Sequence, residues 1–443
     1  MKIVSLCGLL GYGYSEEALN NAFSEKVDYV GVDAGSTDPG PYYLGSGKSF
    51  TDRSAVKRDL SLAMPKALQH KAPFIIGTAG GAGAREHTDW LIDIIKDVAV
   101  EQKLSFKLGV IYSDVQKEYV MEKFKNGKTI DMSAEFPLSE ENIEASERIV
   151  SQVGIAPVIE LLKQNVDIIV AGRMCDTAIY AAPCVYEGYS EGLAFHMAKI
   201  MECGAMCSEP VAAADVMQGY MYDDYFELRP ANPARRCTVD RVAAHTLYEQ
   251  SNPYMIYEPD GVCDLTNSMF EQIDERTVRV SGSVFSEAKQ KTLKLEGVKC
   301  SGYRTICMAT VFDTETIKHM TEIIDTVTAF VKETTKNTLP ANSYTINFKL
   351  SGGEDSSLGI IMDIIGKTQE IADTVCALAR SRMLHCDYEG RKSTAGNLAF
   401  PFSPSDIHVG AVYEFSIFHL AKVESLMETS KIQIEEVYHE KTD

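Results

Sequence analysis

The stretch VDYVGVDAGSTDPGPYYLG, residues 27–45, joins a short apolar run to a loop rich in glycine, proline and acidic residues. The apolar run is typical of a buried β-strand, and the loop begins where that strand must end. The glycines permit positive φ angles, and the two prolines restrict the backbone path. The stretch therefore predicts a strand that ends in a rigid, mostly buried loop.

Four further apolar runs in the first half of the chain resemble this one. They are KIVSLCGL, PFIIGT, FKLGVIYS and VDIIVAG, at residues 2–9, 73–78, 106–113 and 166–172. Each is followed by a Gly-rich or polar loop, and segments long enough for a helix separate them. Near-continuous apolar strands that alternate with helices are typical of a parallel sheet covered on both faces. The fold class that we predict is α/β, with a mostly parallel sheet and helices on both faces.

Two of the connecting segments have helical periodicity. The first, residues 138–154, carries Ser139 as an N-cap and has Ile143, Ile149, Val150 and Val153 along one side. The second, residues 190–204, places Leu193, Met197 and Met201 on one stripe and ends at Gly204. We predict a helix over most of each segment.

The character of the sequence changes after about Tyr257, where alternating segments predict an antiparallel excursion. A polar stretch, residues 331–343, then leads into two strand patterns, one long helix pattern and a last strand. This order favours a small α+β domain of ferredoxin-like type. We therefore predict an α/β domain over residues 1–338 and a ferredoxin-like α+β domain over residues 339–443.

The net charge of −20 argues against a nucleic-acid or anionic membrane partner, since no basic run stands out in the sequence. No uninterrupted apolar segment of about 18 residues occurs, so no membrane span is predicted. The first residues resemble a buried strand more than a signal peptide. These features predict a cytoplasmic protein.

The eleven cysteines are an odd number and are scattered along the chain, which indicates reduced thiols rather than a disulfide framework. The densest group, Cys175, Cys184, Cys203 and Cys207, lacks the short CxxC pairs of common metal sites. An iron–sulfur cluster is therefore not expected.

The loop that follows residues 27–32 lies where an open parallel sheet usually binds its ligand. Asp33 and Asp38 could turn toward one point, as Mg²⁺ ligation or acid–base chemistry requires, and Ser36 and Thr37 add donors and acceptors. The alternative is that these side chains only satisfy backbone groups within a tight turn. The first interpretation predicts that the loop forms one wall of the principal pocket.

The segment GTAGGAGA, residues 77–84, resembles an anion cradle in front of a helix that begins near Arg85. Thr78, Gly80 and Gly81 are its candidate binding residues. The segment lacks the Gly-Lys-Ser/Thr of a Walker motif, and no G-x-G-x-x-G fingerprint follows the first strand. A nicotinamide dehydrogenase would therefore rest on fold analogy alone.

The segment AGRMCDTA, residues 171–178, supplies reactive side chains. Arg173 could hold a carboxylate, and Cys175 or Asp176 could act as base, nucleophile or ligand. The alternative is an Arg173–Asp176 ion pair beside a buried Cys175. On its apolar helix, His196 is better explained as a core histidine with satisfied hydrogen bonds.

Long motifs spread over the whole chain resemble the acyclic terpene utilisation (AtuA) family. They are LGYGYSEEAL, DAGSTDPGPYYLG, GTAGGAG, AGRMCDTA, SGSVF, LEGVKCSGYRTI and AGNLAFPFSPSDI. The resemblance implies a cytoplasmic, catabolic protein that acts with a small partner protein, and a carboxyl-terminal AtuA-like ferredoxin-fold domain. We also expect a homo-oligomer. The residues that match the family's text in the candidate loops are Asp33, Ser36, Thr37, Asp38, Thr78, Gly80, Gly81, Arg173 and Asp176.

Our first functional hypothesis is a lyase of the hydratase or dehydratase kind, acting on a small carboxylate or its acyl-CoA thioester. Arg173 would hold the carboxylate, the amides of residues 77–83 would bind an anion or an enolate oxygen, and Asp38 or Asp176 would move the proton. The second hypothesis is a non-catalytic scaffold subunit that docks a partner through residues 397–407, where Phe400 and Phe402 lie.

Overall fold

The computed structural model describes residues 1–35, 40–132, 137–353 and 357–439. The chain divides into two compact units: unit 1 comprises Met1–Lys299 and Phe415–Asp443, and unit 2 comprises Cys300–Glu414. Unit 2 is thus an insertion in the sequence of unit 1. The boundary that we predicted at residue 338 falls inside unit 2, in the connection between a helix and a strand.

The centre of unit 1 is a ten-stranded sheet with the order β14-β15-β10-β9-β1-β2-β3-β7-β4-β21. The five runs that predicted strands form its parallel part, in the order β1-β2-β3-β7-β4, and neighbouring strands within this part pair in parallel. These strands are β1 (Lys2–Ser5), β2 (Tyr29–Gly35), β3 (Phe74–Gly81), β4 (Phe106–Tyr112) and β7 (Ile168–Ala171). The prediction of these strands is confirmed.

The sheet as a whole is mixed, so the prediction of a mostly parallel sheet is wrong. Antiparallel strands extend it beyond β1 on one side and beyond β4 on the other. They are β9 (Met217–Met221), β10 (Tyr225–Pro230), β14 (Met269–Gln272), β15 (Val278–Ser281) and β21 (Lys431–Val437). The last of these pairs with β4 from the far end of the sequence, which local patterns do not reveal.

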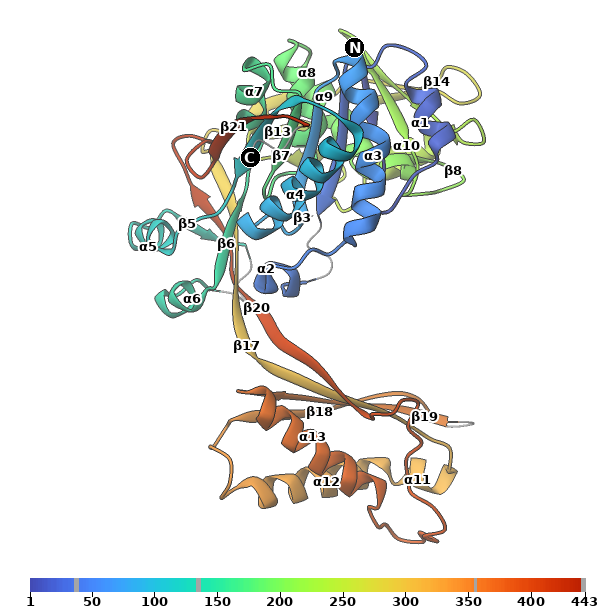
Figure 1. The fold of residues 1–443 in the computed structure, drawn as a ribbon, viewed down its shortest axis with the longest axis vertical. Coiled ribbons are helices and arrows are strands. Elements are labelled where there is room, and N and C mark those ends of the chain that lie inside the picture. Colours follow the sequence, from blue (N-terminus) through green and yellow to red (C-terminus); the bar gives the residue numbers. More distant parts are fainter. Residues whose placement is uncertain (36–39, 133–136, 354–356, 440–443) are drawn as a thin grey trace. The chain divides into compact units, whose positions relative to one another are not determined.

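Helices cover both faces of the sheet in unit 1, as predicted (Figure 1). Successive strand residues pack into different layers: Ile75 joins the layer under α7, α8 and α9, and Ile76 joins the layer under α1, α3 and α4. The helices of the two layers are α7 (Ala156–Lys163), α8 (Ala178–Tyr186), α9 (Glu191–Met201), α1 (Glu16–Ala22), α3 (Arg53–His70) and α4 (Arg85–Gln102). Burial of both strand faces explains the near-continuous apolar runs.

The predicted helix over residues 138–154 is only half correct. Ser139 does cap a helix, α6 (Glu140–Ala145), by accepting a hydrogen bond from the Asn142 amide at 3.1 Å. The rest forms strand β6 (Arg148–Gln152), which pairs antiparallel with β17 (Thr292–Val311). Adjacent β-branched residues suit a strand as well as a helix, so the distant pairing decides between them.

The second predicted helix is confirmed as α9. His196 lies within it, fully buried, with its ring nitrogens 2.6 Å from Ser283 Oγ and 3.1 Å from Thr246 Oγ1. This confirms the interpretation of His196 as a core histidine with satisfied hydrogen bonds.

The remaining elements of unit 1 connect the strands or form small accessory sheets. They are α2 (Tyr42–Ser46), α5 (Lys117–Lys125), β5 (Thr129–Asp131), the 3₁₀ helix η1 (Gly204–Cys207), β8 (Ser208–Glu209), β11 (Arg236–Cys237), α10 (Val239–Thr246), β12 (Met255–Tyr257), β13 (Gly261–Asp264) and β16 (Val284–Glu287). Within the described residues, no helix is long and apolar enough to cross a membrane.

Unit 2 has its own apolar core between a sheet and two helices. Its strands follow the order β18-β19-β17-β20, where β17 and β20 also contribute residues to unit 1. The elements are α11 (Thr314–Lys318), α12 (Met320–Thr335), β18 (Tyr344–Gly353), β19 (Ser357–Gly366), α13 (Gln369–Leu384) and β20 (Asp406–Lys422). The strands and the long helix predicted after residue 343 are confirmed.

Candidate functional site

The candidate site lies at the carboxyl edge of the parallel strands in unit 1. Asp33 lies near the end of β2, Thr78 lies near the end of β3, and Arg173 and Asp176 follow β7. Because neighbouring parallel strands end at one edge of a sheet, these residues come together although they are distant in sequence. Thr78 and Arg173 are in direct contact through a hydrogen bond between their side chains.

Arg173 is a buried arginine whose guanidinium is held by two protein groups, the Glu296 carboxylate and the Thr78 hydroxyl. Its Nε and Nη2 donate to Glu296 Oε2 and Oε1 at 2.9 and 3.4 Å, and its Nη1 donates to Thr78 Oγ1 at 3.4 Å. Glu296 comes from β17, and Lys294 lies 2.7 Å from the same carboxylate. The predicted alternative, an Arg173–Asp176 pair, is replaced here by a pair with a residue far along the chain.

Thr78 adopts an unusual backbone conformation, with a φ of 41° although it is β-branched and fully buried. Such a conformation is strained for a threonine and persists only when the surroundings hold it. The hydroxyl accepts a hydrogen bond from the Met174 amide at 3.3 Å and donates one to the Met174 carbonyl at 3.2 Å. Thr78 therefore ties the end of β3 to the segment that carries Arg173.

Two carboxyl groups at this edge each have a buried oxygen atom without a hydrogen-bond partner among the described residues, Asp33 Oδ1 and Asp176 Oδ1. Burial raises the pKa of Asp33 well above its usual value, and the nearby Asp176 raises it further, while Arg173 opposes both effects. Burial also raises the pKa of Asp176, and Arg173 and Lys199 partly oppose the shift. Two acids whose pKa values are raised in one place are typical of proton-transfer sites.

A second group of charges lies behind Asp176. Lys199 of α9 donates to Glu202 Oε1, and both residues are buried. Burial raises the pKa of Glu202 to about 8, although Lys199 opposes the shift. Burial likewise raises the pKa of Glu258 to about 8, while its hydrogen bond from Thr177 Oγ1, at 2.9 Å, has the opposite effect. The site is thus rich in acids that hold protons near neutral pH.

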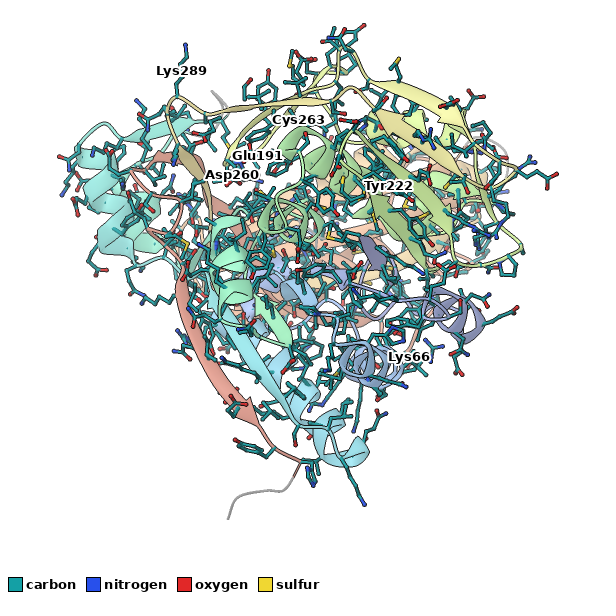
Figure 2. All side chains as sticks on the ribbon, turned by 90° about the horizontal axis from the view of Figure 1, so that it is seen from above. Lys66, Glu191, Tyr222, Asp260, Cys263 and Lys289 are labelled. Atoms are coloured by element: carbon teal, nitrogen blue, oxygen red, sulfur yellow. The ribbon has the colours of Figure 1, made fainter. Side chains whose placement is uncertain are left out.

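Asp260 extends this acidic region toward the amino-terminal end of α9 (Figure 2). Figure 2 shows Asp260 close to Glu191, and the Cys263 thiol donates to the Gly192 carbonyl at 3.3 Å. Burial raises the pKa of Asp260 to about 6; its hydrogen bond from the Ile155 amide opposes the shift, and the Glu191 carboxylate adds to it. This region is the margin of the site.

The structure brings together only part of the predicted set. Ser36, Thr37 and Asp38 lie outside the described residues, so their predicted roles stay predictions. Cys175 is buried, and burial raises the pKa of its thiol well above the usual value, which disfavours a thiolate nucleophile. It lies beside the site as a protonated thiol.

Gly80 and Gly81 meet structural demands that the sequence prediction did not include. Both have positive φ angles, 61° and 101°. An added Cβ would lie 2.8 Å from His87 Cβ at Gly80, and 2.8 Å from Phe50 Cβ at Gly81. Close packing against α4 and residue 50 therefore explains these glycines without a ligand.

Sequence reasoning missed Glu296, Lys294, Lys199 and Glu202. The last two lie three residues apart, Lys199 in α9 and Glu202 directly after it, and α9 is buried from Gly192 to Met201; charges in such a position are a signal of pairing or function. Glu296 offered a weaker signal, a lone acid next to the buried Leu295 in a strand pattern. Its partner could not be deduced from local sequence.

We predict that Gly83→Ala destabilises unit 1 by about 2–3 kcal/mol. Gly83 has a φ of 70°, and an added Cβ would lie 2.1 Å from the Arg173 amide nitrogen. The matched control is Gly127→Ala, where φ is 64° but no atom lies within 4 Å of the added Cβ, so only the backbone cost of about 1 kcal/mol is expected. Urea unfolding of both variants measures the difference, and equal losses would contradict close packing at Gly83.

Within the described ranges, no group of three or more His, Cys, Asp or Glu side chains is arranged to hold a metal ion. The predicted Mg²⁺ site involves Asp38, which lies outside those ranges.

Comparison with known proteins agrees with the motifs. The family model described as acyclic terpene utilisation family protein AtuA matches residues 16–220 and 229–379, and the second match enters unit 2 and continues past residue 338. No curated protein and no solved structure gives a significant match. Because the matched ranges cover most of the sequence, the chain belongs to the acyclic terpene utilisation AtuA family.

Proposed function

We propose that this protein is a cytoplasmic catabolic lyase of the hydratase or dehydratase kind, acting on a small carboxylate or its acyl-CoA thioester. One observation carries the proposal: Asp33 Oδ1 and Asp176 Oδ1 are buried and have no hydrogen-bond partner among the described residues. A buried polar atom without a partner costs free energy, so a native fold that keeps two of them together has a reason to do so. A substrate that hydrogen-bonds to these oxygens supplies that reason.

Acid–base catalysis needs one carboxyl group with a proton and one without at the same pH. Burial raises the pKa of both acids, and Arg173 opposes the shift at both; Asp176 raises the pKa of Asp33 further, whereas Lys199 is a second cation that favours the charged form of Asp176. These surroundings support Asp33 as the protonated acid and Asp176 as the ionised base. Asp38 remains a further candidate for the base.

The reaction follows from these roles. Asp176 removes the proton from the carbon next to the carbonyl, and Asp33 gives its proton to the hydroxyl on the neighbouring carbon. The C–H and C–O bonds break, a C=C bond forms, and the hydroxyl leaves as water. In the reverse direction the same two groups add water. The backbone amides of residues 77–83 are the candidate donors to the enolate oxygen.

The charge around the site favours a thioester over a free carboxylate. Two guanidinium nitrogens of Arg173 donate hydrogen bonds to Glu296, and Lys199 is paired with Glu202. A substrate carboxylate would therefore meet paired cations and several acids, whereas a thioester carbonyl brings no charge. We accordingly assign to Arg173 an electrostatic role rather than the binding of a substrate carboxylate.

Thermal-shift screening tests the proposal before any assay exists. A ligand of the native state at 100 times its dissociation constant is expected to stabilise the protein by about 2.7 kcal/mol. The screen should contain hydroxy acids, unsaturated acids and their coenzyme A esters, and free coenzyme A is the control for the carrier alone. A hit should then show release or uptake of water by mass spectrometry, and hits that are all unchanged after prolonged incubation would argue against a lyase.

One observation favours the scaffold alternative. In unit 2, Phe402 is 56% exposed and Phe312 is 66% exposed, whereas Phe400 packs against the unit's own core. Exposed aromatic side chains often anchor partners. Turnover by the purified chain alone would reject the scaffold role. Turnover that occurs only when a co-purified partner protein is present would support it.

We also infer that unit 2 is a ferredoxin-like module. Its order along the chain is strand, helix, strand, strand, helix, strand once the short α11 is set aside, and its sheet order is β18-β19-β17-β20. This arrangement supports the ferredoxin-like type, which was predicted from residues 339–443 alone. The first strand and first helix come instead from residues before that boundary.

A further inference from the structure

We propose that an arginine-lined cleft in unit 1 binds a ligand with two or more phosphate groups, such as a nucleoside diphosphate or coenzyme A. The cleft has a volume of about 1190 Å³ and lies between β8, β11, the start of α10 and the turn between β14 and β15. Its charged lining residues are Arg235, Arg236, Arg241, Arg276, Glu209 and Glu275.

Two of the arginines are fixed by backbone carbonyl groups. Arg276 donates Nε to the Arg235 carbonyl at 2.8 Å, and Nη2 to the carbonyls of Pro230 and Asn232 at 2.8 and 2.6 Å. Arg235 donates Nε to Asp215 at 2.6 Å and Nη1 to the Pro210 carbonyl. The Arg276 guanidinium, which is held by carbonyls, therefore keeps its positive charge in place, whereas the charge of Arg235 is paired with Asp215.

The other two arginines share one acid. Arg236 and Arg241 each make one long contact with Glu209, at 3.3 and 3.4 Å, and their side chains are 60% and 48% exposed. Bidentate arginine–carboxylate pairs are shorter and stronger than these single contacts. Both guanidinium groups can therefore turn to a phosphate at little cost.

The cleft stands out against the rest of the protein, which has 63 acidic and 43 basic residues. No basic run marks the cleft in the sequence because Arg235 and Arg236 form only a pair, because neutral and acidic residues separate them from Arg241, and because Arg276 comes from a distant turn. Arg229, Asp274 and Glu275 lie nearby as well, and Asp274 accepts hydrogen bonds from the Arg276 amide and from Thr277 Oγ1. Two fixed and two mobile guanidinium groups around one cleft are suited to phosphate recognition.

The cleft lies at the same edge of the sheet as the candidate site, which is consistent with the proposed reaction. The proposal that the cleft binds phosphates does not depend on that reaction. Met217 of β9 pairs with Ser5 at the carboxyl end of β1 and with Pro230 of β10, so the Pro230 carbonyl that holds Arg276 belongs to the site's edge of the sheet. If the substrate is a coenzyme A ester, this cleft is the candidate place for its phosphates, and that further step rests on the proposed function.

Isothermal titration calorimetry of the full chain tests the cleft without any turnover. Inorganic phosphate, pyrophosphate, ADP and coenzyme A are titrated into the native protein and into the double variant Arg236→Gln/Arg241→Gln. We expect pyrophosphate, ADP and coenzyme A to bind more tightly than phosphate, and the double variant to lose at least about tenfold in affinity. Tighter binding of coenzyme A than of ADP and pyrophosphate identifies an acyl carrier, and equal binding identifies the phosphates alone.

The matched control is Arg53→Gln/Arg382→Gln, which removes two exposed arginines elsewhere. An equal loss in this control would show a general charge effect and overturn the proposal, as would the absence of binding by all four ligands at millimolar concentration. Because binding is measured apart from turnover, failure here leaves the test of Asp33 and Asp176 intact.

Discussion

Turnover of the substrate should fall by about 10²–10⁴-fold in Asp176→Asn and in Asp33→Asn, the range that a positioned acid or base contributes. Asparagine keeps the size of the side chain and one acceptor oxygen, but it can neither take up nor give a proton. Steady-state kinetics on the ligand found by thermal-shift screening measures the loss. The matched control is Asp167→Asn, at the opposite edge of the sheet, where the carboxylate accepts a hydrogen bond from the Lys107 amide at 2.8 Å.

The same variants should gain stability near neutral pH. The pKa of Asp33 and of Asp176 is raised above the usual 3.8 in the folded protein, so the folded state favours the protonated form. Stability from these groups is present below the unfolded pKa and is lost as the pH rises through the folded pKa. Asparagine mimics the protonated acid, so the free energy of unfolding at pH 7 should rise by about 1–2 kcal/mol.

Full turnover in either variant would exclude that residue as acid or base, and a variant that unfolds would indicate a structural role.

Breaking the buried Arg173–Glu296 pair should cost about 3–5 kcal/mol of the free energy of unfolding. The two side chains are 6% and 3% exposed, so Glu296→Gln leaves the buried guanidinium without its hydrogen-bonded carboxylate partner. The matched control is Glu86→Gln, which breaks a surface pair in which Arg148 Nε and Nη2 contact Glu86 Oε1 at 3.0 and 2.9 Å. Glu86 is about half exposed, so that loss should be at most about 1 kcal/mol. Urea unfolding at pH 7 measures both.

The pH dependence gives a second check on this pair. Burial alone would raise the pKa of Glu296, but Arg173 and Lys294 outweigh it and lower the pKa to about 2. The stabilisation is therefore complete above the ordinary glutamate pKa of 4.5 and is lost as the pH falls from there through 2. Glu296→Gln should lack this acid-dependent part. Equal losses in the buried and surface variants would contradict the importance of burial.

The sequence predicts best what depends on local patterns. The five parallel strands were found because burial on both faces leaves a continuous apolar run, and Ile75 and Ile76 illustrate it by packing into opposite layers. The convergence of Thr78 and Arg173 was also predicted, since parallel strands end at one edge. These inferences need only the chain direction and the period of the pattern.

What depends on distant pairing was not predicted. Glu296 meets Arg173 across 123 residues, and β21 reaches β4 from the end of the chain. The segment around Ile149 fits a helix or a strand by itself, and only its pairing with β17 makes it a strand. In such segments tertiary contacts, rather than local propensity, decide the secondary structure.

The insertion of unit 2 has a consequence for synthesis on the ribosome. Residues 300–414 are synthesised after residues 1–299 and before residues 415–443, so the two sequence parts of unit 1 are made at different times. Until β21 is synthesised, the sheet of unit 1 lacks its outermost strand on the β4 side, because β21 pairs along β4 from Tyr112 to Phe106. Until then the edge of β4 is an unpaired strand edge on a nascent protein, the kind of surface that promotes aggregation. The unit that carries the candidate site is thus completed only after the whole of the inserted unit has been synthesised.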